Sequence, residues 1–317
     1  MPCHAGFAVG GRTHPCHVAS EKRQGLTLPM FAISLGVFAA LCWSVHDLLA
    51  KIHATRIGPY RMAFWVMAVG IAAVAVPVLW RGQGVAITQP AVWTALVMGF
   101  VYAGAVAGLF KAFSLAPVSI VGPFTAGYPA LVVFWHLFEG LVPSLFEWLA
   151  LLLAACGAVV VARMGPKDGG LKTIAPGKLP VVIFASVAAA ICFATTVVLG
   201  QAAAATLGQY ETTLISRFPA ALALLPFALR DKGSLPAMTG GAWSGISAMA
   251  VLDVAAVSAV NAAGFFPGSE YSAMGISLYG GIAVVLATIF LKDKVSFGQW
   301  LGIAMIIAGV AILGWPK

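Results

Sequence analysis

Ionisable and amide side chains stand inside otherwise apolar stretches of this sequence. Asp253 lies in the middle of one such stretch, and Asn261 follows about two turns later on a similar side of a helix. A charged side chain at the centre of a membrane helix costs about 2.5–3.5 kcal/mol on insertion scales, so it requires a partner or a function. Asp253 is therefore predicted either to bind a substrate amine or carry a coupling proton in a central cavity, or to pair with Arg217 or another buried base.

Further polar and aromatic residues extend this candidate site. His46 lies in the last third of the first apolar run, and histidine titrates near neutral pH, which suits a role in a cavity. Asp47 precedes Lys51 by four residues, a spacing that favours a structural ion pair along one helix face. Arg217 suits an anionic substrate, or a pair with the aspartate named above or with Glu211. Candidate aromatic walls of the cavity are Trp43, Tyr102, Tyr128 and Tyr279.

The composition shows which solvent these residues meet. The 317 residues are 61% hydrophobic and 9% charged, whereas a soluble protein has about 25% charged residues. Apolar runs of about 20 residues recur and can each cross a hydrocarbon layer of ~30 Å. We therefore predict an all-α polytopic membrane protein. The net charge of +8 is then assigned to loops near lipid headgroups and not to nucleic-acid binding. Ten transmembrane helices are predicted, at residues 30–50, 59–80, 91–113, 118–138, 145–163, 180–205, 210–230, 242–263, 270–291 and 297–315.

One stretch of the sequence occurs twice, from Leu115 to Val161 and from Phe265 to Leu313. Each copy has a proline with a serine two residues later, an acidic residue in a turn, a Trp-Leu pair, and a glycine nine residues after the tryptophan. The acidic residues are Glu139 and Asp293, and their repetition favours structural roles in the turns. Internal repetition of this kind indicates duplicated architecture.

The repeat divides the chain into four predicted segments: a disordered leader at 1–29, a first five-helix repeat at 30–163, a basic linker loop at 164–179 and a second five-helix repeat at 180–317. Five is odd, so the second repeat must enter the membrane from the opposite face, which gives the inverted-topology repeats of secondary transporters. The leader contains closely spaced cysteines and histidines, but no second pair follows at finger-like spacing, so no metal site is predicted.

Backbone breaks occur at matching places in the two repeats. The fourth predicted span directly follows Pro117 and contains Gly122-Pro123 and Gly127, and the ninth contains Gly275 and Gly280-Gly281. Interrupted helices in corresponding positions of inverted halves indicate a binding site, because freed backbone groups can face a cavity. Kinking for packing is the alternative explanation.

Several motifs resemble the drug/metabolite transporter superfamily, and within it the EamA-type transporters with ten helices. The motifs are Ala112–Pro123, Tyr128-Pro129 ahead of Glu139, Trp43-Ser44, Arg61 and Gln299–Leu313. Asp293 stands where the family usually has glutamate, and Gly280 stands where a proline often occurs. The resemblance implies a secondary transporter of small organic metabolites with both termini in the cytoplasm. The basic residues gather in the odd-numbered loops, and the positive-inside rule would place both termini outside, so both orientations stay open.

The predicted function is transport of a small, amino-acid-like metabolite by alternating access across the cell's inner (plasma) membrane. Proton coupling through Asp253 or His46 and facilitated exchange are both open, and no cofactor is expected. Predicted partners are the substrate, the lipid bilayer and a second copy in a homodimer. One alternative is a non-transporting membrane partner or assembly protein. Another is an intramembrane hydrolase using Gly241–Gly245 (GAWSG), which is disfavoured because no histidine follows His136 as a base.

Overall fold

The computed structural model describes residues 15–82, 89–116, 128–140, 142, 144–164, 174–231, 240–266, 268–290 and 296–313. Ten membrane spans are built from helices, which confirms the predicted all-α class. Seven spans are long and apolar enough to cross a bilayer, and three shorter apolar helices begin at Tyr128, Leu145 and Phe297. The helices are α1 (Pro15–Ile57), α2 (Pro59–Arg81), α3 (Pro90–Phe113), α5 (Tyr128–Phe138), α6 (Leu145–Arg163), α7 (Leu179–Leu207), α8 (Gln209–Arg230), α9 (Gly240–Ala263), α10 (Tyr271–Ile276), α11 (Tyr279–Phe290) and α12 (Phe297–Leu313).

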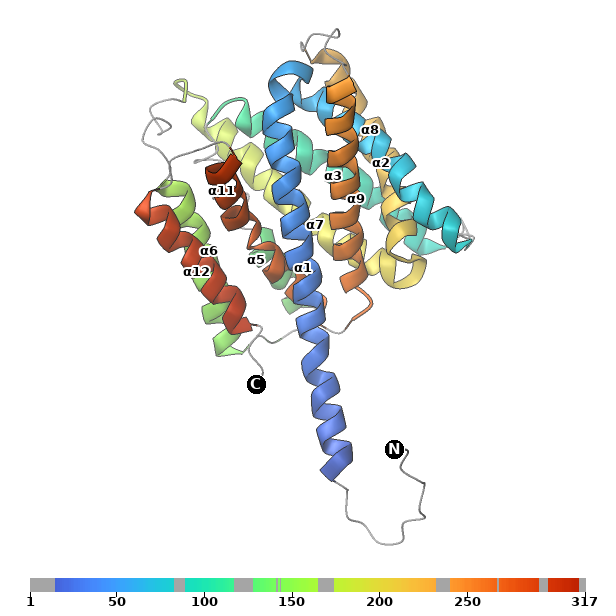
Figure 1. Ribbon diagram of the computed structural model, residues 1–317, viewed down its shortest axis with the longest axis vertical. Helices are drawn as coiled ribbons and strands as arrows, with labels where there is room; N and C mark the ends of the chain where they lie inside the picture. The colour runs from blue at the N-terminus through green and yellow to red at the C-terminus, as the bar shows by residue number, and fades with distance from the viewer. Residues whose placement is uncertain are drawn as a thin grey trace.

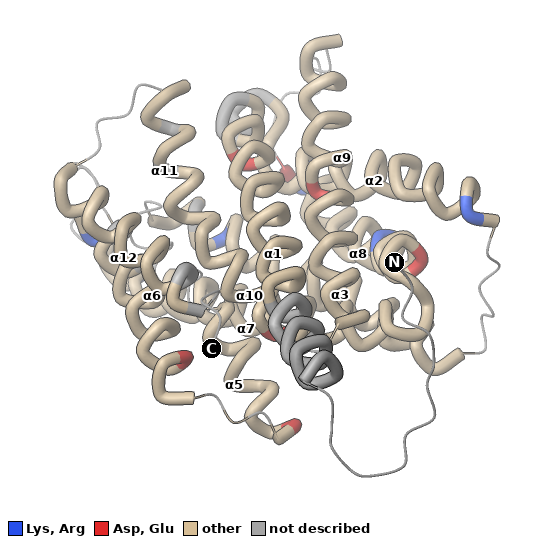
Figure 2. Tube along the Cα trace, turned by 60° about the horizontal axis from the view of Figure 1, so that its bottom comes forward, with Lys and Arg blue, Asp and Glu red and all other residues tan. Residues whose placement is uncertain are grey.

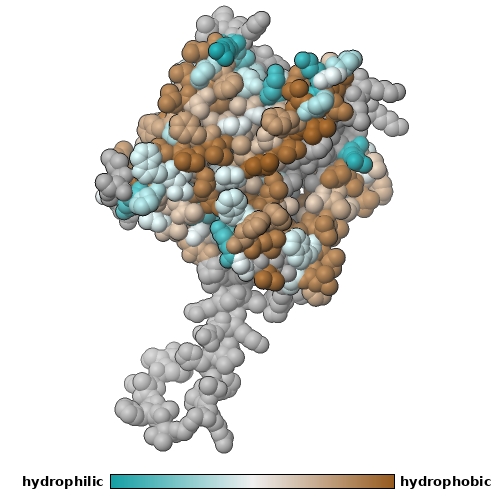
Figure 3. Space-filling view, turned by 180° about the vertical axis from the view of Figure 1, so that it is seen from behind, coloured by the Kyte–Doolittle hydropathy of each residue, from teal (hydrophilic) through white to brown (hydrophobic). Residues whose placement is uncertain are grey.

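The helices run roughly side by side, and α1 extends beyond the bundle at its N-terminal end (Figure 1). Charged residues occupy few positions along them (Figure 2), and apolar residues cover much of the face seen in Figure 3. Exposed apolar side chains such as Phe184, Leu222 and Trp93 suit contact with lipid tails. The protein is therefore a multi-pass integral membrane protein.

The helix contacts show an approximate two-fold symmetry that exchanges each helix of one repeat with its counterpart in the other. In this exchange α1, α2, α3 and α6 correspond to α7, α8, α9 and α12, in chain order. Helix α1 packs against α9 as α3 packs against α7, and α3 packs against α8 as α2 packs against α9. Helices α2 and α8 pack on each other, as do α6 and α12, so these two pairs lie on the exchange axis. The core of the protein is thus formed between the repeats.

The largest difference between the observed helices and the predicted spans is at the first span. Helix α1 begins at Pro15, ahead of the predicted start at Met30, and its added part contains the good helix formers Glu21, Lys22 and Gln24. The ninth span is interrupted, as predicted, since α10 ends at Ile276 and α11 begins three residues later, at Tyr279. Residues 117–127, where the fourth span was predicted to break, lie outside the described residues, and so do Asp293 and residues 1–14.

The glycines that recur in the repeat allow α6 and α12 to approach closely. A Cβ atom added at Gly157 would lie 2.6 Å from the carbonyl oxygen of Gly302, and one added at Gly309 would lie 2.7 Å from that of Ala150. Both distances are too short for real Cβ contacts, so only glycine fits at either position. Small residues that let helix backbones meet are a common basis of helix association in membranes.

Replacing Gly309 by leucine is expected to lower the thermal unfolding midpoint in detergent. The new side chain would push α12 away from α6, and overpacking of this kind costs about 1–3 kcal/mol. Gly280→Ala is the matched control, because a Cβ added there meets no atom within 4 Å. Equal midpoints for the two variants would contradict the close approach of these helices.

Candidate functional site

Asp253 and Arg217 form a buried ion pair at the centre of the protein. Nη1 of Arg217 lies 2.6 Å from Oδ2 of Asp253, and each side chain is only 2% exposed. Arg217 comes from α8, which carries Pro219 two residues further along, and Asp253 comes from the middle of α9. The sequence left three possible partners for Arg217: an anionic substrate, Asp253 or Glu211. In the structure its partner is Asp253.

Helices of the first repeat complete the surroundings of this pair. Trp43 of α1 donates its indole N–H to Oδ1 of Asp253 at 2.9 Å, and Tyr102 of α3 donates its hydroxyl to the same oxygen at 2.9 Å. The Arg217 guanidinium also lies 5.5 Å from the centre of the Tyr102 ring and contacts the sulfur of Met67 at 2.6 Å. Two aromatic residues predicted as cavity walls are therefore hydrogen-bond donors to the central carboxylate.

Both charged residues of the central ion pair belong to the second repeat. Over the first three helices of each repeat, corresponding positions differ by 150 in number, as the pairs Trp93 and Trp243 or Gly58 and Gly208 show. By this rule the counterpart of Arg217 is Met67, and the counterpart of Asp253 is position 103, an alanine. Arg217 and Met67 contact each other, because α2 and α8 lie on the exchange axis. The approximate symmetry is thus broken by charge at the centre of the protein.

Two of the donor nitrogens of the Arg217 guanidinium make no hydrogen bond to the described residues. Its Nε and Nη2 atoms are buried and have no hydrogen-bond partner among the described residues. A guanidinium presents a planar fork of donors that matches a carboxylate with two parallel hydrogen bonds. An anionic group arriving beside Arg217 would satisfy donors that the protein itself leaves unused.

Asn261 belongs to a separate polar network between α8 and α9. Its amide donates to Oγ1 of Thr213 at 3.1 Å, and Thr213 contacts the hydroxyl of Ser258 at 3.1 Å. Gln201 of α7 donates to the hydroxyl of Ser272 at 2.8 Å. Sequence reasoning did not single out Gln201 or Thr213, although a buried amide in an alanine-rich run was a usable signal for Gln201.

His46 and Asp47 form a third group, with Tyr279 of the other repeat. Nδ1 of His46 lies 2.9 Å from Oδ1 of Asp47, and the Tyr279 hydroxyl donates to the Asp47 carboxylate. The side chains of His46 and Asp47 are 18% and 46% exposed. Ser44 donates to the Tyr279 carbonyl oxygen at 3.1 Å, which holds the interrupted ninth span against α1. The pairing predicted between Asp47 and Lys51 involves a side chain outside the described residues.

Tyr128 and Glu139 lie at opposite ends of α5. The Tyr128 ring packs 5.8 Å from the ring of Phe193, next to the cluster that also holds Trp43. Glu139 accepts from the indole of Trp135 at 3.1 Å and contacts Nδ1 of His136 at 2.7 Å. Tyr128 is thus close to the central site, whereas Glu139 bonds residues of its own helix end.

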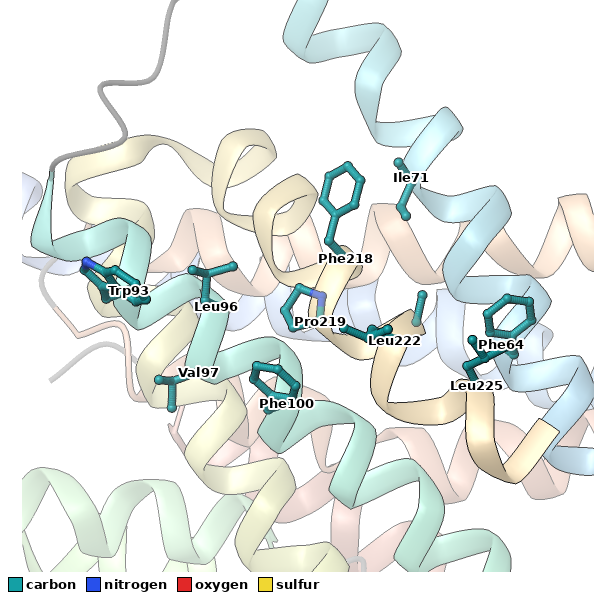
Figure 4. Close-up of a pocket in the computed structure, with 11 residues that line it drawn as sticks. Phe64, Ile71, Trp93, Leu96, Val97, Phe100, Phe218, Pro219, Leu222 and Leu225 are labelled. Carbon is teal, nitrogen blue, oxygen red and sulfur yellow. The ribbon is translucent and has the colours of Figure 1, made fainter. Parts of the chain in front are cut away.

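An apolar groove of about 670 Å³ lies on the outer side of α2, α3 and α8 (Figure 4). Its lining includes Trp93, Phe100, Phe218, Pro219 and Leu222, all drawn in Figure 4. Phe218 directly follows Arg217 in α8, but Arg217 itself does not line the groove, and no charged side chain is among its lining residues. Such a surface suits hydrocarbon and does not suit a charged ligand.

Comparisons with known proteins agree with this architecture. A model of the EamA-like transporter family matches residues 30–163 and 180–315. A crystal structure of a protein 21% identical in sequence superposes with a TM-score of 0.75 and covers 89% of this chain and 95% of its own. At that identity the likeness shows the fold alone. No curated protein matches the chain.

Proposed function

Because the chain belongs to the EamA-like transporter family, we propose that it is a secondary transporter of an amino-acid-like zwitterion, working by alternating access. The family supplies the general activity, membrane transport of a small molecule. The substrate class is our inference from the charges at the centre of the protein. We further propose that the protein resides in the cell's inner (plasma) membrane.

The buried pair of Arg217 and Asp253 carries this proposal. Both side chains are almost fully buried, and they face aromatic donors from the other repeat. A substrate with both an ammonium and a carboxylate group can take the place of both partners in the ion pair. Its ammonium would pair with Asp253 in place of Arg217, and its carboxylate would pair with Arg217 in place of Asp253. The exchange leaves neither buried charge without a partner, which would otherwise be strongly unfavourable.

A ligand with a single charge cannot make this exchange. An amine alone would pair with Asp253 and leave Arg217 uncompensated, and a carboxylate alone would leave Asp253 uncompensated. Charge-assisted hydrogen bonds contribute about 1.5–3 kcal/mol each, so a zwitterion is favoured over either analogue. Specificity then arises from the cost of leaving a buried group unpaired.

Alternating access is supported by the way the site is assembled. Trp43 and Tyr102 come from the first repeat, and Arg217 and Asp253 come from the second. Relative movement of the repeats would therefore separate the ion pair from its aromatic partners. Such rocking of inverted repeats about a site near the bilayer midplane is the usual mechanism of secondary transporters. Asp253 and His46 are the residues that we propose for proton coupling, and facilitated exchange without protons is the alternative.

Counterflow in proteoliposomes tests the proposed transport. Purified protein is reconstituted into vesicles loaded with a mixture of unlabelled amino acids, and entry of trace labelled amino acids is followed. We expect transient accumulation of at least one amino acid above the level of protein-free vesicles. Repetition with an imposed pH gradient then separates proton coupling from exchange.

The matched control uses vesicles loaded with sugars, nucleosides or organic phosphates and the corresponding labelled tracers. Accumulation of one of these classes, with no amino acid transported by the same preparation, would contradict the proposed substrate class and leave the transporter assignment intact. Absence of counterflow across every class, in protein that elutes as a folded species, would contradict transport itself.

A further inference from the structure

Asp231 fastens the two repeats together at one end of α2 and α8. Its Oδ2 accepts hydrogen bonds from the backbone N–H of Tyr60 at 2.9 Å and of Arg61 at 3.2 Å, in the first turn of α2. The Arg61 side chain donates to the Asp231 carbonyl oxygen at 2.7 Å. A carboxylate at a helix N-terminus accepts hydrogen bonds from free N–H groups and interacts favourably with the positive end of the helix dipole. This Asp231 latch therefore joins the C-terminus of α8 to the N-terminus of α2.

The exchange of repeats places an equivalent pair at the other end of the same two helices. By the difference of 150, Arg61 corresponds to Glu211 and Asp231 corresponds to Arg81, so acid and base are interchanged. The two ends are also alike in their backbone, because Gly58 before α2 has φ 90° and Gly208 before α8 has φ 99°. The second end thus contains the components of a latch with opposite polarity.

The second pair is not formed in this structure. The guanidinium of Arg81, an exposed residue, lies 5.8 Å from the centre of the Tyr210 ring, next to Glu211 in the chain. Glu211 is 1% exposed, and neither of its carboxylate oxygens has a hydrogen-bond partner among the described residues. A buried carboxylate without a partner is costly, so this arrangement favours any state in which a cation reaches it.

The side chains packed at the Asp231 end of α2 and α8 are also less polar than those packed at the Glu211 end. At the Asp231 end, Met62, Ala63 and Val66 of α2 belong to a buried apolar cluster. Their counterparts at the Glu211 end are Thr212, Thr213 and Ser216, which are also buried. The Asp231 end is thus sealed by apolar side chains, whereas the Glu211 end is filled with groups that water can solvate.

From these observations we propose that Arg81 and Glu211 form a second latch between the repeats, made when the Asp231 latch opens. The inference rests on the alternating access proposed above and names the residues that hold each state. The present structure is the state with the Asp231 latch closed. In the other state Arg81 pairs with Glu211, and the apolar cluster around Met62 becomes accessible.

A labelling experiment tests this latch without any substrate, so its failure is distinguishable from failure of the transport proposal. All five native cysteines are replaced, Met62→Cys is introduced as a reporter, and the protein is placed in lipid nanodiscs. The rate of labelling by a hydrophilic maleimide then reports opening of the Asp231 end. Asp231→Asn is expected to raise this rate, and Glu211→Gln is expected to lower it, each about fivefold.

A double-mutant cycle shows whether Arg81 and Glu211 act as a pair. Arg81→Gln alone should lower the labelling rate as Glu211→Gln does, and the double variant should show no further decrease. Arg230→Gln, at an exposed arginine that ends α8 at the other end, is the matched control and should leave the rate unchanged. Additive effects of the two substitutions would overturn the pairing.

Arg81 is exposed, so Arg81→Gln is expected to fold even if Glu211→Gln does not. An unchanged labelling rate in Arg81→Gln would then overturn the proposal by itself.

Discussion

Replacing Arg217 by methionine is expected to lower the free energy of unfolding by about 3–5 kcal/mol, because Asp253 would be left as a buried charge without its partner. Trp43 and Tyr102 would still donate to the carboxylate, but neither supplies a positive charge. Unfolding in mild detergent, followed by circular dichroism against temperature or denaturant, measures the change. Methionine is chosen because the first repeat has Met67 at the corresponding position.

The double variant Arg217→Met with Asp253→Ala is the control for this effect. It installs in the second repeat the residues that the first repeat has, and it removes both charges together. Replacement of a whole buried ion pair by apolar residues is often nearly neutral for stability. The double variant should therefore recover most of the loss. A double variant less stable than Arg217→Met would show that the pair is not the source of the effect.

Replacing Asp253 by asparagine is expected to reduce transport of the amino acid substrate by about 10–100-fold. The variant keeps an oxygen acceptor for Trp43 and Tyr102 but loses the charge that would bind the substrate ammonium. A charge-assisted hydrogen bond contributes about 1.5–3 kcal/mol, and about 1.4 kcal/mol corresponds to a tenfold change. Initial uptake rates in proteoliposomes over a range of substrate concentrations measure this loss.

Glu139→Gln is the matched control for that measurement. It removes the charge of another acidic residue, which lies at the exposed end of α5 and bonds only its own helix end among the described contacts. Its uptake should equal that of the unaltered protein. Equal uptake by Asp253→Asn and Glu139→Gln would remove Asp253 from the substrate site.

Most of the fold is predictable from the sequence, because membrane helices are encoded by local apolar runs. The doubled motif with Gly157 and Gly309 predicts two repeats, and the structure explains those glycines by the contact of α6 with α12. The interruption of the ninth span was also predicted. Its position between Ile276 and Tyr279 was not predicted. In the structure Ser44 of the other repeat donates a hydrogen bond to the Tyr279 carbonyl oxygen at this break, a contact that no local sequence pattern specifies.

Of the contacts around the central ion pair, the sequence offered only the pairing of Arg217 with Asp253, as one of several options. Asp253 and Arg217 were singled out as charges within membrane helices, and Trp43 and Tyr102 as aromatic cavity walls. The structure brings these four side chains together. Asn261 was expected on a similar side to Asp253, but its amide bonds Thr213 in a separate network. These connections join helices far apart in the chain, and no local pattern specifies which helices become neighbours.

Thermal unfolding in the presence of three matched ligands tests the proposed zwitterion site most directly. The ligands are leucine, 3-methylbutylamine, which lacks its carboxylate, and 4-methylpentanoate, which lacks its ammonium, with the other amino acids run alongside in case the side chain does not fit. A ligand that binds the folded protein raises its unfolding midpoint by mass action. We expect an amino acid to raise the midpoint, its two singly charged analogues to raise it much less, and Asp253→Asn to abolish the increase. An amine or an acid that stabilises the protein as well as the corresponding amino acid would contradict the exchange of the Arg217–Asp253 pair for a zwitterion.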